Sequence, residues 1–282
     1  MDRRTEEKIV RAIMIGSLSL VLAFLVIVVG LIVLKGVPAL SFSMVTQIPK
    51  GGYYLGKEGG VLNAILGSLY LGLGSTLVAT LLALPTALAL QKEYVRSARL
   101  GYFMRLSLDV LWGMPSIVYG AFGFIVMLML GLKASLLGGI VVLTLLQLPI
   151  MVRSMEEVLR MVPGELKEAS YTLGATRLET TARVVLRQAF PGLVTGVLLA
   201  FGRGIGDAAS ILFTAGYTDR LPNSLFEPVA SLPLAIFFQL STPFPEVQQR
   251  AYASALILLL LVLGVSLAAR FLSKRFMKNV IR

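Results

Sequence analysis

Six stretches of the chain consist almost entirely of apolar residues, and the polar residues gather between them. The six runs are Ala12–Leu34, Val61–Leu90, Leu108–Leu130, Ala134–Val152, Gly192–Thr214 and Ala251–Leu272. A helix needs about twenty apolar residues to cross the hydrocarbon core of a bilayer, so each run predicts a membrane-spanning helix. The pattern therefore predicts an all-α membrane protein with six transmembrane helices.

The first apolar run follows the charged sequence MDRRTEEKIVR, an arrangement shared by signal peptides and membrane anchors. Its apolar part is about twenty-three residues long, which exceeds the apolar region of a signal peptide, and no A-x-A cleavage site follows. We therefore expect a retained anchor helix. The second run would be about 45 Å long as a helix, so it is expected to tilt or to kink near Pro85.

Lysine and arginine residues are concentrated on one side of the predicted spans. Most of the 26 lie in the N-terminal segment, in the loops Gln91–Ser107 and Arg153–Pro191, and in the C-terminal tail. By the positive-inside rule, both termini and both of these loops are predicted to be cytoplasmic. Arg203 lies near the middle of the fifth predicted span.

Two longer segments fall on the outer side of this topology. Gly36–Gly60 is rich in glycine and predicts an irregular hairpin or loop. Ala215–Arg250 carries several prolines around an apolar stretch, Leu232–Leu240, that is too short to span a bilayer. That stretch either lies along the membrane surface, which is the interpretation we favour, or dips back towards a transport pathway.

Composition narrows the class further. The chain is 56% hydrophobic and 15% charged, with a mean hydropathy of +0.83, as is typical of a multi-pass membrane protein. A net charge of +11 would indicate nucleic-acid binding in a soluble chain, but here the basic residues flank apolar runs, so we expect no nucleic-acid partner. Cysteine and histidine are both absent, which argues against thiol chemistry, zinc and haem ligation and Ser-His-Asp triads. We predict no catalytic residues, no metal and no cofactor.

The loop between the fourth and fifth predicted spans has the pattern of two short helices joined by a turn. Pro163 suits the first turn of a helix, and Glu168 complements the positive end of that helix. Gly174 can take the left-handed conformation that ends a helix. Thr176 and Glu179 then form T-x-x-E, a capping box that begins the next helix.

One face of the first short helix is small and mildly apolar, because Leu166, Ala169, Ser170 and Leu173 recur at the helical period. A helix lying on the membrane surface is the alternative. This face has no Trp or Phe, however, and too little apolar area for firm insertion. We interpret the two short helices as a docking element that fits a cleft on a soluble partner protein.

Arg203 and Asp207 are charged residues within the fifth predicted span, one helical turn apart. Arg203 follows Pro191 by about 18 Å of helix, which places it near the middle of the membrane. A buried charge there costs roughly 2.5–3.5 kcal/mol on insertion scales, so the pair indicates a function. The alternative is a structural ion pair in which each charge neutralises the other. We favour transport, because a guanidinium offers two parallel donors to a tetrahedral oxyanion.

Pro115 interrupts the third predicted span, with Ser116 next to it. A proline removes a backbone donor, so the helix either breaks and exposes backbone groups to a pathway or forms a simple packing kink. Gln147 and Asn63 are isolated polar residues in spans, and such residues usually hold helices together.

The pattern E-A-S-x3-G, from Glu168 to Gly174, resembles the EAA loop of ABC-transporter permeases. Ser170 stands for the second alanine of the family pattern, and Arg187 stands where a proline is expected. In that family the loop docks into the nucleotide-binding subunit. The resemblance therefore implies that Glu168, Ala169, Ser170 and Gly174 transmit ATP-driven motion. This chain has no G-x-x-x-x-G-K-[ST] motif, so ATP would be bound by partner ABC ATPase subunits.

Four further stretches resemble the phosphate permeases of ABC transporters, the PstA type. They are RGIGDAASILFTAG from Arg203, WGMPSIVYG from Trp112, SLFEPVASLP from Ser224 and PFPEVQ from Pro243. They follow the family order along the chain. Asp207 stands where the family usually has a glutamate, which shortens the reach of the carboxylate by one methylene.

The resemblance implies a type I ABC permease core of five helices in residues 61–276, with a coupling loop at about 153–190. Residues 1–60 would form an N-terminal anchor and an external segment. The implied function is import of inorganic phosphate across a bacterial cytoplasmic membrane, by a subunit that is surrounded by membrane lipid and performs no covalent chemistry. Its partners would be two ABC ATPase subunits, a second, homologous permease subunit and an external phosphate-binding protein.

Within that assembly, Arg203, Asp207 and Ser116 would line the translocation pathway. Two alternatives stay open at this point. One is a permease for another oxyanion, such as molybdate or sulfate. The other is a membrane scaffold or sensor that only recruits a soluble ATPase.

Overall fold

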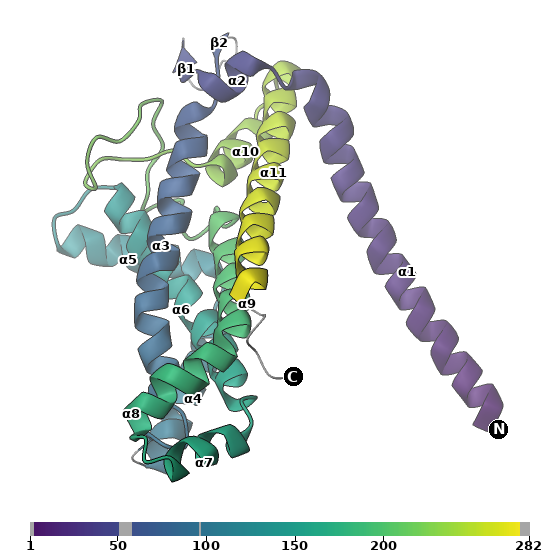
Figure 1. Ribbon diagram of the computed structural model, residues 1–282. Coiled ribbons are helices and arrows are strands. Elements are labelled where there is room, and N and C mark those ends of the chain that lie inside the picture. Colours follow the sequence, from purple (N-terminus) through teal and green to yellow (C-terminus); the bar gives the residue numbers. More distant parts are fainter. Residues whose placement is uncertain (1–2, 51–57, 96, 277–282) are drawn as a thin grey trace.

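The computed structural model describes residues 3–50, 58–95 and 97–276, and most of this part of the chain is helical (Figure 1). Its α-helices are α1 (Arg3–Gly36), α2 (Phe42–Thr46), α3 (Leu62–Ala89), α4 (Ala98–Gly113), α5 (Ser116–Met129), α6 (Leu136–Arg160), α7 (Gly164–Thr172), α8 (Arg177–Thr180), α9 (Leu186–Ile205), α10 (Leu232–Leu240) and α11 (Pro245–Phe276). A 3₁₀ turn spans Val37–Ala39 and a π-helical turn spans Thr181–Val185. The all-α fold class is confirmed.

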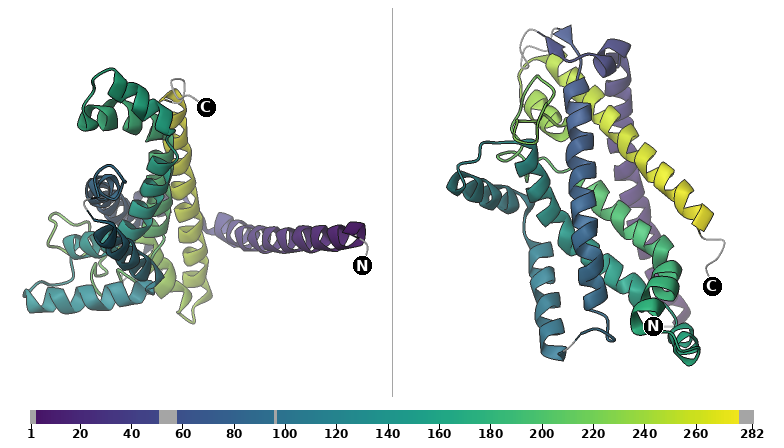
Figure 2. Two further views of the ribbon diagram at one scale, coloured as in Figure 1. Left: turned by 90° about the horizontal axis from the view of Figure 1, so that it is seen from below. Right: turned by 60° about the vertical axis from the view of Figure 1, so that its left-hand side comes forward.

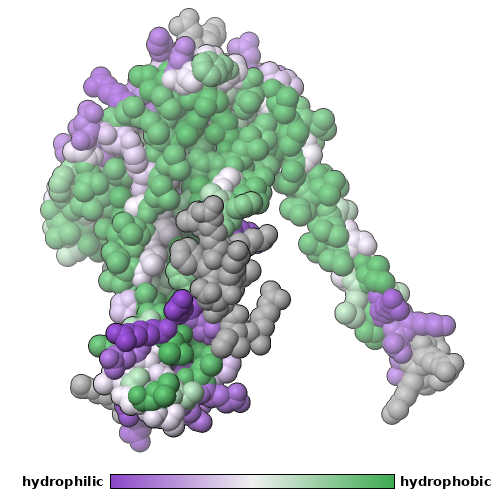
Figure 3. All heavy atoms as spheres, in the orientation of Figure 1, coloured by the Kyte–Doolittle hydropathy of each residue, from purple (hydrophilic) through white to green (hydrophobic). Residues whose placement is uncertain are grey.

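Among the described residues, five helices are long and apolar enough to cross a membrane, and the bent pair of α4 and α5 makes a sixth span if it is counted as one. Apolar residues cover the flanks of the molecule and most of α1, whereas hydrophilic residues gather at the two ends (Figure 3). This distribution matches a multi-pass membrane protein with five or six spans.

The body of the molecule is a bundle built around α3, α6, α9 and α11 (Figures 1 and 2). Ala79, Ala83 and Ala87 of α3 are fully buried in one cluster with Met151 and Met155 of α6. Lipid tails are as apolar as these side chains, so burial alone does not bring the helices together in a bilayer. Close packing through small residues explains why α3 and α6 lie side by side.

Helix α1 leaves the bundle and extends away from it (Figures 1 and 2). No part of its apolar stretch is buried against other described residues. Its contact with the body lies at its C-terminal end, where Lys35 Nζ is 4.9 Å from the centre of the Tyr252 ring on α11. A Cβ on Gly36 would lie 2.8 Å from Tyr252 O, so the glycine permits this close crossing. The prediction of a peripheral helix before the core is confirmed.

A short hairpin connects α2 to α3. Strands β1 (Pro49–Lys50) and β2 (Glu58–Gly59) pair antiparallel, as expected for an irregular hairpin between Gly36 and Gly60. Its connection, residues 51–57, includes Gly51, Gly52 and Lys57 and lies outside the described residues.

The third apolar run does not form one helix. Helix α4 begins at Ala98, ahead of the predicted start at Leu108, and ends at Gly113, and α5 leaves it at an angle of 101°. Met114 between them is extended, with φ −73° and ψ 136°, because a residue before proline disfavours the helical conformation. Of the two alternatives at Pro115, the break is therefore confirmed and the simple packing kink was wrong.

The fifth apolar run is also shorter as a helix than predicted. Helix α9 ends at Ile205, and residues 206–215 form irregular turns instead of continuing to Thr214. This segment is held by the neighbouring elements: Ser135 N donates to Thr214 O at 2.9 Å.

The fourth span is longer as a helix than predicted, because α6 runs to Arg160, well past the predicted end at Val152.

The short helix α10 packs against α3 and α11, with its first turn buried and Phe237 and Leu240 exposed (Figure 1). Leu232 and Leu234 are fully buried, and Leu232 N donates to Ser68 Oγ of α3 at 2.8 Å. The burial of this first turn was not predicted from the sequence. The physical reason is long-range: Gly67 and Ser68 provide a notch on α3 that the local sequence of α10 does not reveal.

We expect Gly67→Ala to destabilise the fold, because a Cβ there would lie 1.9 Å from Ala230 O, which is backbone and cannot move away cheaply. The cost of such overpacking is about 1–3 kcal/mol. The midpoint of thermal unfolding of the purified protein in detergent should fall. Gly16→Ala on α1 is the matched control, since no heavy atom lies within 4 Å of that position. Equal midpoints for the two variants would contradict the buried placement of α10.

Candidate translocation pathway and docking surface

Arg203 lies in the last turn of α9, on an exposed face of this chain. Thr195 and Leu199 precede it at a spacing of four residues and are exposed as well, so the three share one face of the helix. Other described residues of this chain therefore do not cover Arg203. Among the described residues, its guanidinium makes no ion pair.

Asp207 does not lie one turn further along the same helix. Gly206 caps the end of α9, and Asp207 belongs to the following turn, where its Oδ1 accepts a hydrogen bond from Ser210 N at 2.8 Å. Aspartate readily bonds nearby backbone groups in this way, which favours turns over helix. The structural ion pair between Arg203 and Asp207 is absent from the described residues, and the carboxylate instead shapes the turn.

Ser116 is half-buried at the first position of α5. Pro115 precedes it and provides no side-chain cap, so the first N–H groups of α5 have no capping side chain. One turn later, a Cβ on Gly120 would lie 2.7 Å from Ser210 O and 2.9 Å from Ala209 O. The structure thus brings the beginning of α5 next to the turn that follows Arg203 and contains Asp207.

A buried polar network between α3 and α6 lies against α9 beside this turn. Gln147 of α6 is fully buried, and its Nε2 donates to Ser75 Oγ at 2.9 Å, while Thr76 Oγ1 donates to its Oε1 at 3.0 Å. A Cβ on Gly204 would lie 1.9 Å from Gln147 Nε2, so α9 approaches the network through this glycine. The predicted role of Gln147 in holding helices together is confirmed. Asn63 likewise bonds across the fold, with Nδ2 donating to Thr218 O at 2.7 Å.

The two short helices expected between the fourth and fifth spans are α7 and α8. Gly174 ends the first with φ +81°, the left-handed conformation predicted for it. The capping box is present: Glu179 N donates to Thr176 Oγ1 at 3.3 Å, and Thr176 N donates to Glu179 Oε2 at 3.0 Å. Both local predictions are confirmed, because each depends on residues only a few positions apart.

The predicted docking residues lie on this hairpin, at one end of the bundle (Figure 1). Glu168 and Ala169 are exposed on α7, and Leu173 beside the turn is 89% exposed. Ser170 is half-buried, and its Oγ lies 2.9 Å from Thr180 Oγ1 of α8, so it ties the two short helices together. An alanine at this position would lack that bond.

The α7–α8 hairpin and Arg203 lie far apart along the length of α9. Helix α9 connects them, and its length from Leu186 to Arg203 corresponds to about 26 Å. A movement of the α7–α8 hairpin must therefore be transmitted to Arg203 through the helices.

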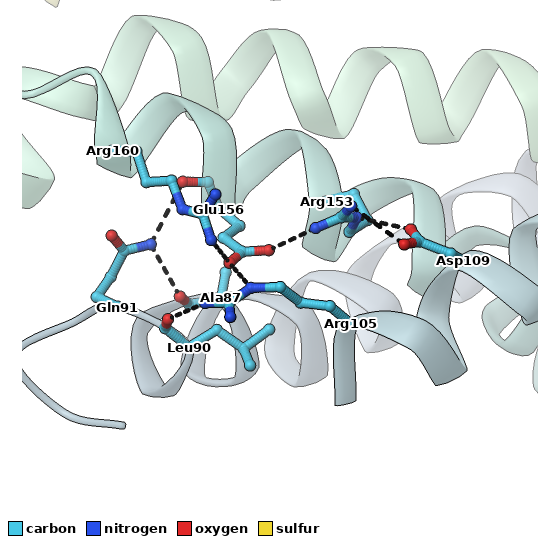
Figure 4. Close-up of polar contacts among 8 residues, drawn as sticks. All are labelled: Ala87, Leu90, Gln91, Arg105, Asp109, Arg153, Glu156 and Arg160. Carbon is cyan, nitrogen blue, oxygen red and sulfur yellow. Dashed lines mark hydrogen bonds and ion pairs between the residues drawn. The ribbon is translucent and has the colours of Figure 1, made fainter. Parts of the chain in front are cut away.

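One cluster of charged residues was not predicted from the sequence. Glu156 of α6 is 1% exposed and is surrounded by three arginines (Figure 4). Arg105 Nε of α4 lies 2.7 Å from its Oε1, Arg153 Nη1 lies 3.1 Å from its Oε2, and Arg160 Nη2 also donates to Oε1. A carboxylate buried this deeply is stable only when it is paired and hydrogen-bonded. We call these four residues the Glu156 cluster.

The Glu156 cluster continues to a second carboxylate on α4. The Arg153 guanidinium contacts both oxygens of Asp109, with Nε at 2.9 Å from Oδ1 and Nη2 at 3.3 Å from Oδ2. The α6 part of this arrangement could be predicted from the sequence, since Arg153, Glu156 and Arg160 follow the helical i, i+3, i+7 spacing. The contacts with Arg105 and Asp109 of α4 could not be predicted, because only the fold brings these residues to α6.

An open groove of about 480 Å³ lies elsewhere, between α3, the beginning of α6 and residues 222–225. Its lining is mostly apolar and includes Tyr70, Leu73 and Ile140, and no charged side chain is among its lining residues. The groove therefore lacks the chemistry to hold an anion, and Arg203 is not part of it.

Comparison with known proteins defines the class. Residues 79–278 match the family described as binding-protein-dependent transport system inner membrane component. The methionine transporter MetNI, solved in an inward-facing conformation, contains a chain with the same fold, with a TM-score of 0.64 at 20% identity over 77% of this chain and 95% of that chain. The protein belongs to this family of membrane permeases and is a multi-pass inner-membrane protein.

Within the family, the similarity to phosphate permeases extends over nearly the whole chain. The phosphate transport system permease protein PstA of Yersinia pestis is 33% identical over 95% of this chain and 90% of its own length. PstA of Mycobacterium leprae is 36% identical over 97% of this chain and 91% of its own length. A probable ABC transporter permease of Bacillus subtilis, YqgI, is 30% identical over 99% of both chains.

Proposed function

We propose that this chain is a membrane-spanning permease subunit of an ATP-driven ABC importer that carries inorganic phosphate into the cytoplasm. The observation that carries the proposal is the Arg203 guanidinium, which lies on an exposed face where α9 ends and has no ion-pair partner among the described residues. The similarity to phosphate permeases supports the choice of anion.

A phosphate passing this face would meet a guanidinium that offers two parallel N–H donors. Asp207 is engaged with Ser210 N, so it does not compete for Arg203 as a counter-ion. It keeps the turn after α9 in place instead. Ser116 and the uncapped N–H groups of α5 add further donors beside this turn, since backbone N–H groups at a helix start favour anions.

A second, homologous permease subunit is needed to complete the pathway. Arg203 is exposed on a single chain, so without a partner its charge would face lipid, which is unfavourable. Helix α1 diverges from the bundle (Figure 2), and no part of its apolar stretch is buried against other described residues. We propose that the partner permease occupies the face bearing Arg203, that α1 contacts it, and that residues 1–60 form a unit distinct from the core.

The α7–α8 hairpin would dock into an ABC ATPase subunit, with Glu168, Ala169, Ser170 and Gly174 at the contact. ATP hydrolysis would then belong to that partner, and this chain would perform no covalent chemistry. Substrate would reach the pathway from an external phosphate-binding protein, as the family description leads one to expect.

We expect Gly174→Val to weaken ATPase docking. No heavy atom lies within 4 Å of a Cβ at Gly174, so the side chain has space, and the cost is the left-handed backbone, roughly 1–2 kcal/mol. The turn should therefore change shape, and less ATPase should co-purify per permease. Gly164→Val is the control, because that position is equally open and its φ is not positive. Equal ATPase recovery with both variants would argue against docking through this turn.

We also expect the α7–α8 hairpin, and both termini, to be cytoplasmic. Reporter domains inserted at Leu173 and at Leu225, both exposed, should report opposite sides of the membrane, with Leu173 inside. A cytoplasmic signal from both positions would contradict the six-span topology.

Reconstitution into liposomes tests the function as a whole. The chain is combined with its ATPase, its partner permease and its binding protein, and ATP-dependent uptake of labelled phosphate, sulfate and molybdate is compared. Uptake of phosphate in preference to both other anions is the expected result. Preferential uptake of sulfate or molybdate would assign another oxyanion, and ATP hydrolysis without uptake of any of the three would favour a scaffold.

A further inference from the structure

The α7–α8 hairpin is attached to the loop between α3 and α4 by side-chain contacts. Lys167 Nζ of α7 lies 2.6 Å from Glu93 Oε1. The Tyr94 hydroxyl lies 2.7 Å from Thr181 Oγ1 and donates to Arg177 O at 3.1 Å. Arg177 Nη1 in turn donates to Glu93 O at 3.2 Å. Two adjacent loop residues thus hold both parts of the hairpin.

The ion pair in this attachment is partly sheltered from water, with Lys167 17% and Glu93 29% exposed. Burial alone would raise the pKa of Glu93, but the hydrogen bond from Lys167, a backbone hydrogen bond and the charges of Lys167 and Lys92 together lower that pKa below its ordinary value. The carboxylate is therefore ionised at neutral pH, which makes the contact a charge-assisted hydrogen bond.

The other end of the same loop is attached to the Glu156 cluster. Gln91 is 6% exposed, and its Nε2 donates to Glu156 O of α6 at 3.3 Å as well as to Ala87 O at 3.2 Å (Figure 4). Arg105 of α4 donates to Leu90 O at 2.7 Å with one nitrogen and to the Glu156 carboxylate with another. The loop is thus bonded to the hairpin on one side and to α4 and α6 on the other.

Helix α4 leads directly to the candidate pathway. It ends at the break before Pro115, and α5 begins at Ser116 beside the turn that contains Asp207. The hairpin is joined through the backbone to α6 and α9, but not to α4. A displacement of the hairpin therefore reaches α4 through non-covalent contacts, and the contacts of Glu93 and Tyr94 are suited to carry it.

We propose that the loop between α3 and α4 is a second coupling element, in which Glu93 and Tyr94 pass movement of the α7–α8 hairpin to α4 through the Glu156 cluster. The break at Pro115 lets α4 move against α5, so the movement opens or closes the surroundings of Arg203 and Asp207. The proposal rests on the proposed function as an ATP-driven importer. It assigns Glu93 and Tyr94 a positioning role, away from the anion itself.

The test uses the complete complex in liposomes and measures phosphate taken up per ATP hydrolysed. Combined Tyr94→Phe and Glu93→Gln removes one hydroxyl and one charge with little change of shape. We expect ATPase recovery and hydrolysis to stay within about twofold of the wild type. Phosphate per ATP should fall by roughly tenfold, because the hairpin then moves without α4.

Tyr102→Phe combined with Glu157→Gln is the matched control, since both side chains are exposed and, among the described residues, neither forms a hydrogen bond or ion pair with the hairpin or the Glu156 cluster. Its phosphate per ATP should equal that of the wild type.

Lys167→Glu alone should lower the phosphate taken up per ATP hydrolysed. Lys167→Glu with Glu93→Lys should restore much of that ratio, because the ion pair is re-formed with its charges exchanged.

The possible results separate the two proposals. An unchanged ratio in the Tyr94→Phe, Glu93→Gln variant would overturn the coupling role, as would a loss of uptake that only follows a loss of bound ATPase. A wild-type complex that hydrolyses ATP but takes up no phosphate would contradict the proposed function, and the coupling role with it.

Discussion

Arg203→Gln is expected to reduce phosphate uptake by about a hundredfold, the effect of losing two hydrogen bonds from a charged donor. The complex should still assemble, because Arg203 has no ion-pair partner among the described residues that its removal would leave unpaired. Labelled phosphate uptake and complex yield are measured together. Arg220→Gln, which removes an exposed arginine from the segment between α9 and α10, should leave both unchanged.

Two further substitutions refine this result. Arg203→Lys keeps the charge but loses the planar fork, so it should leave weak uptake. Combined Arg203→Gln and Asp207→Asn should transport as poorly as Arg203→Gln alone, because Asp207 bonds Ser210 N and does not pair with Arg203. Restored uptake in the double variant would show that the two residues form a structural ion pair after all.

Glu156→Gln is expected to cause the largest loss of stability. A neutral side chain would leave Arg105, Arg153 and Arg160 close together without the carboxylate that binds them, and breaking a buried ion pair costs about 3–5 kcal/mol. Arg153 keeps Asp109, so the remaining charge is only partly compensated. The midpoint of thermal unfolding in detergent and the yield of folded protein should both fall.

Glu157→Gln is the control for this prediction, since Glu157 is the next residue, is exposed, and makes no ion pair among the described residues. It should unfold at the wild-type temperature. If Glu156→Gln also did so, the Glu156 cluster would not hold α4 to α6, and the coupling route through it would lose its basis.

The features that the sequence predicted well depend on neighbouring residues. The apolar runs identify the long helices because each run is a property of its own segment. Gly174 ends α7 and the Thr176–Glu179 capping box begins α8, as predicted, since each effect involves residues within one helical turn. The break at Pro115 follows from the missing N–H and from the restriction that proline places on Met114.

The features that it predicted poorly depend on contacts between distant segments. The burial of α10 requires Gly67 and Ser68 of α3, more than 150 residues away, as in the bond from Leu232 N to Ser68 Oγ with a separation of 164. Asp207 has the spacing of an i+4 partner, yet the helix ends before it reaches that position. For the Glu156 cluster, Arg105 comes from another helix, so the i, i+3, i+7 pattern on α6 shows three of its four residues.

The most direct test of the central claim, that the anion passes Arg203, uses the absence of cysteine from this chain. An Arg203→Cys variant carries one thiol in this subunit, and it is treated in the assembled, cysteine-free complex with a positively or a negatively charged thiol reagent. We predict that phosphate slows labelling during turnover, that the positive reagent restores part of the uptake, and that the negative reagent does not. Arg220→Cys should show neither effect. The account would be contradicted if position 203 were labelled at the same rate with and without phosphate and the positive reagent restored no phosphate uptake.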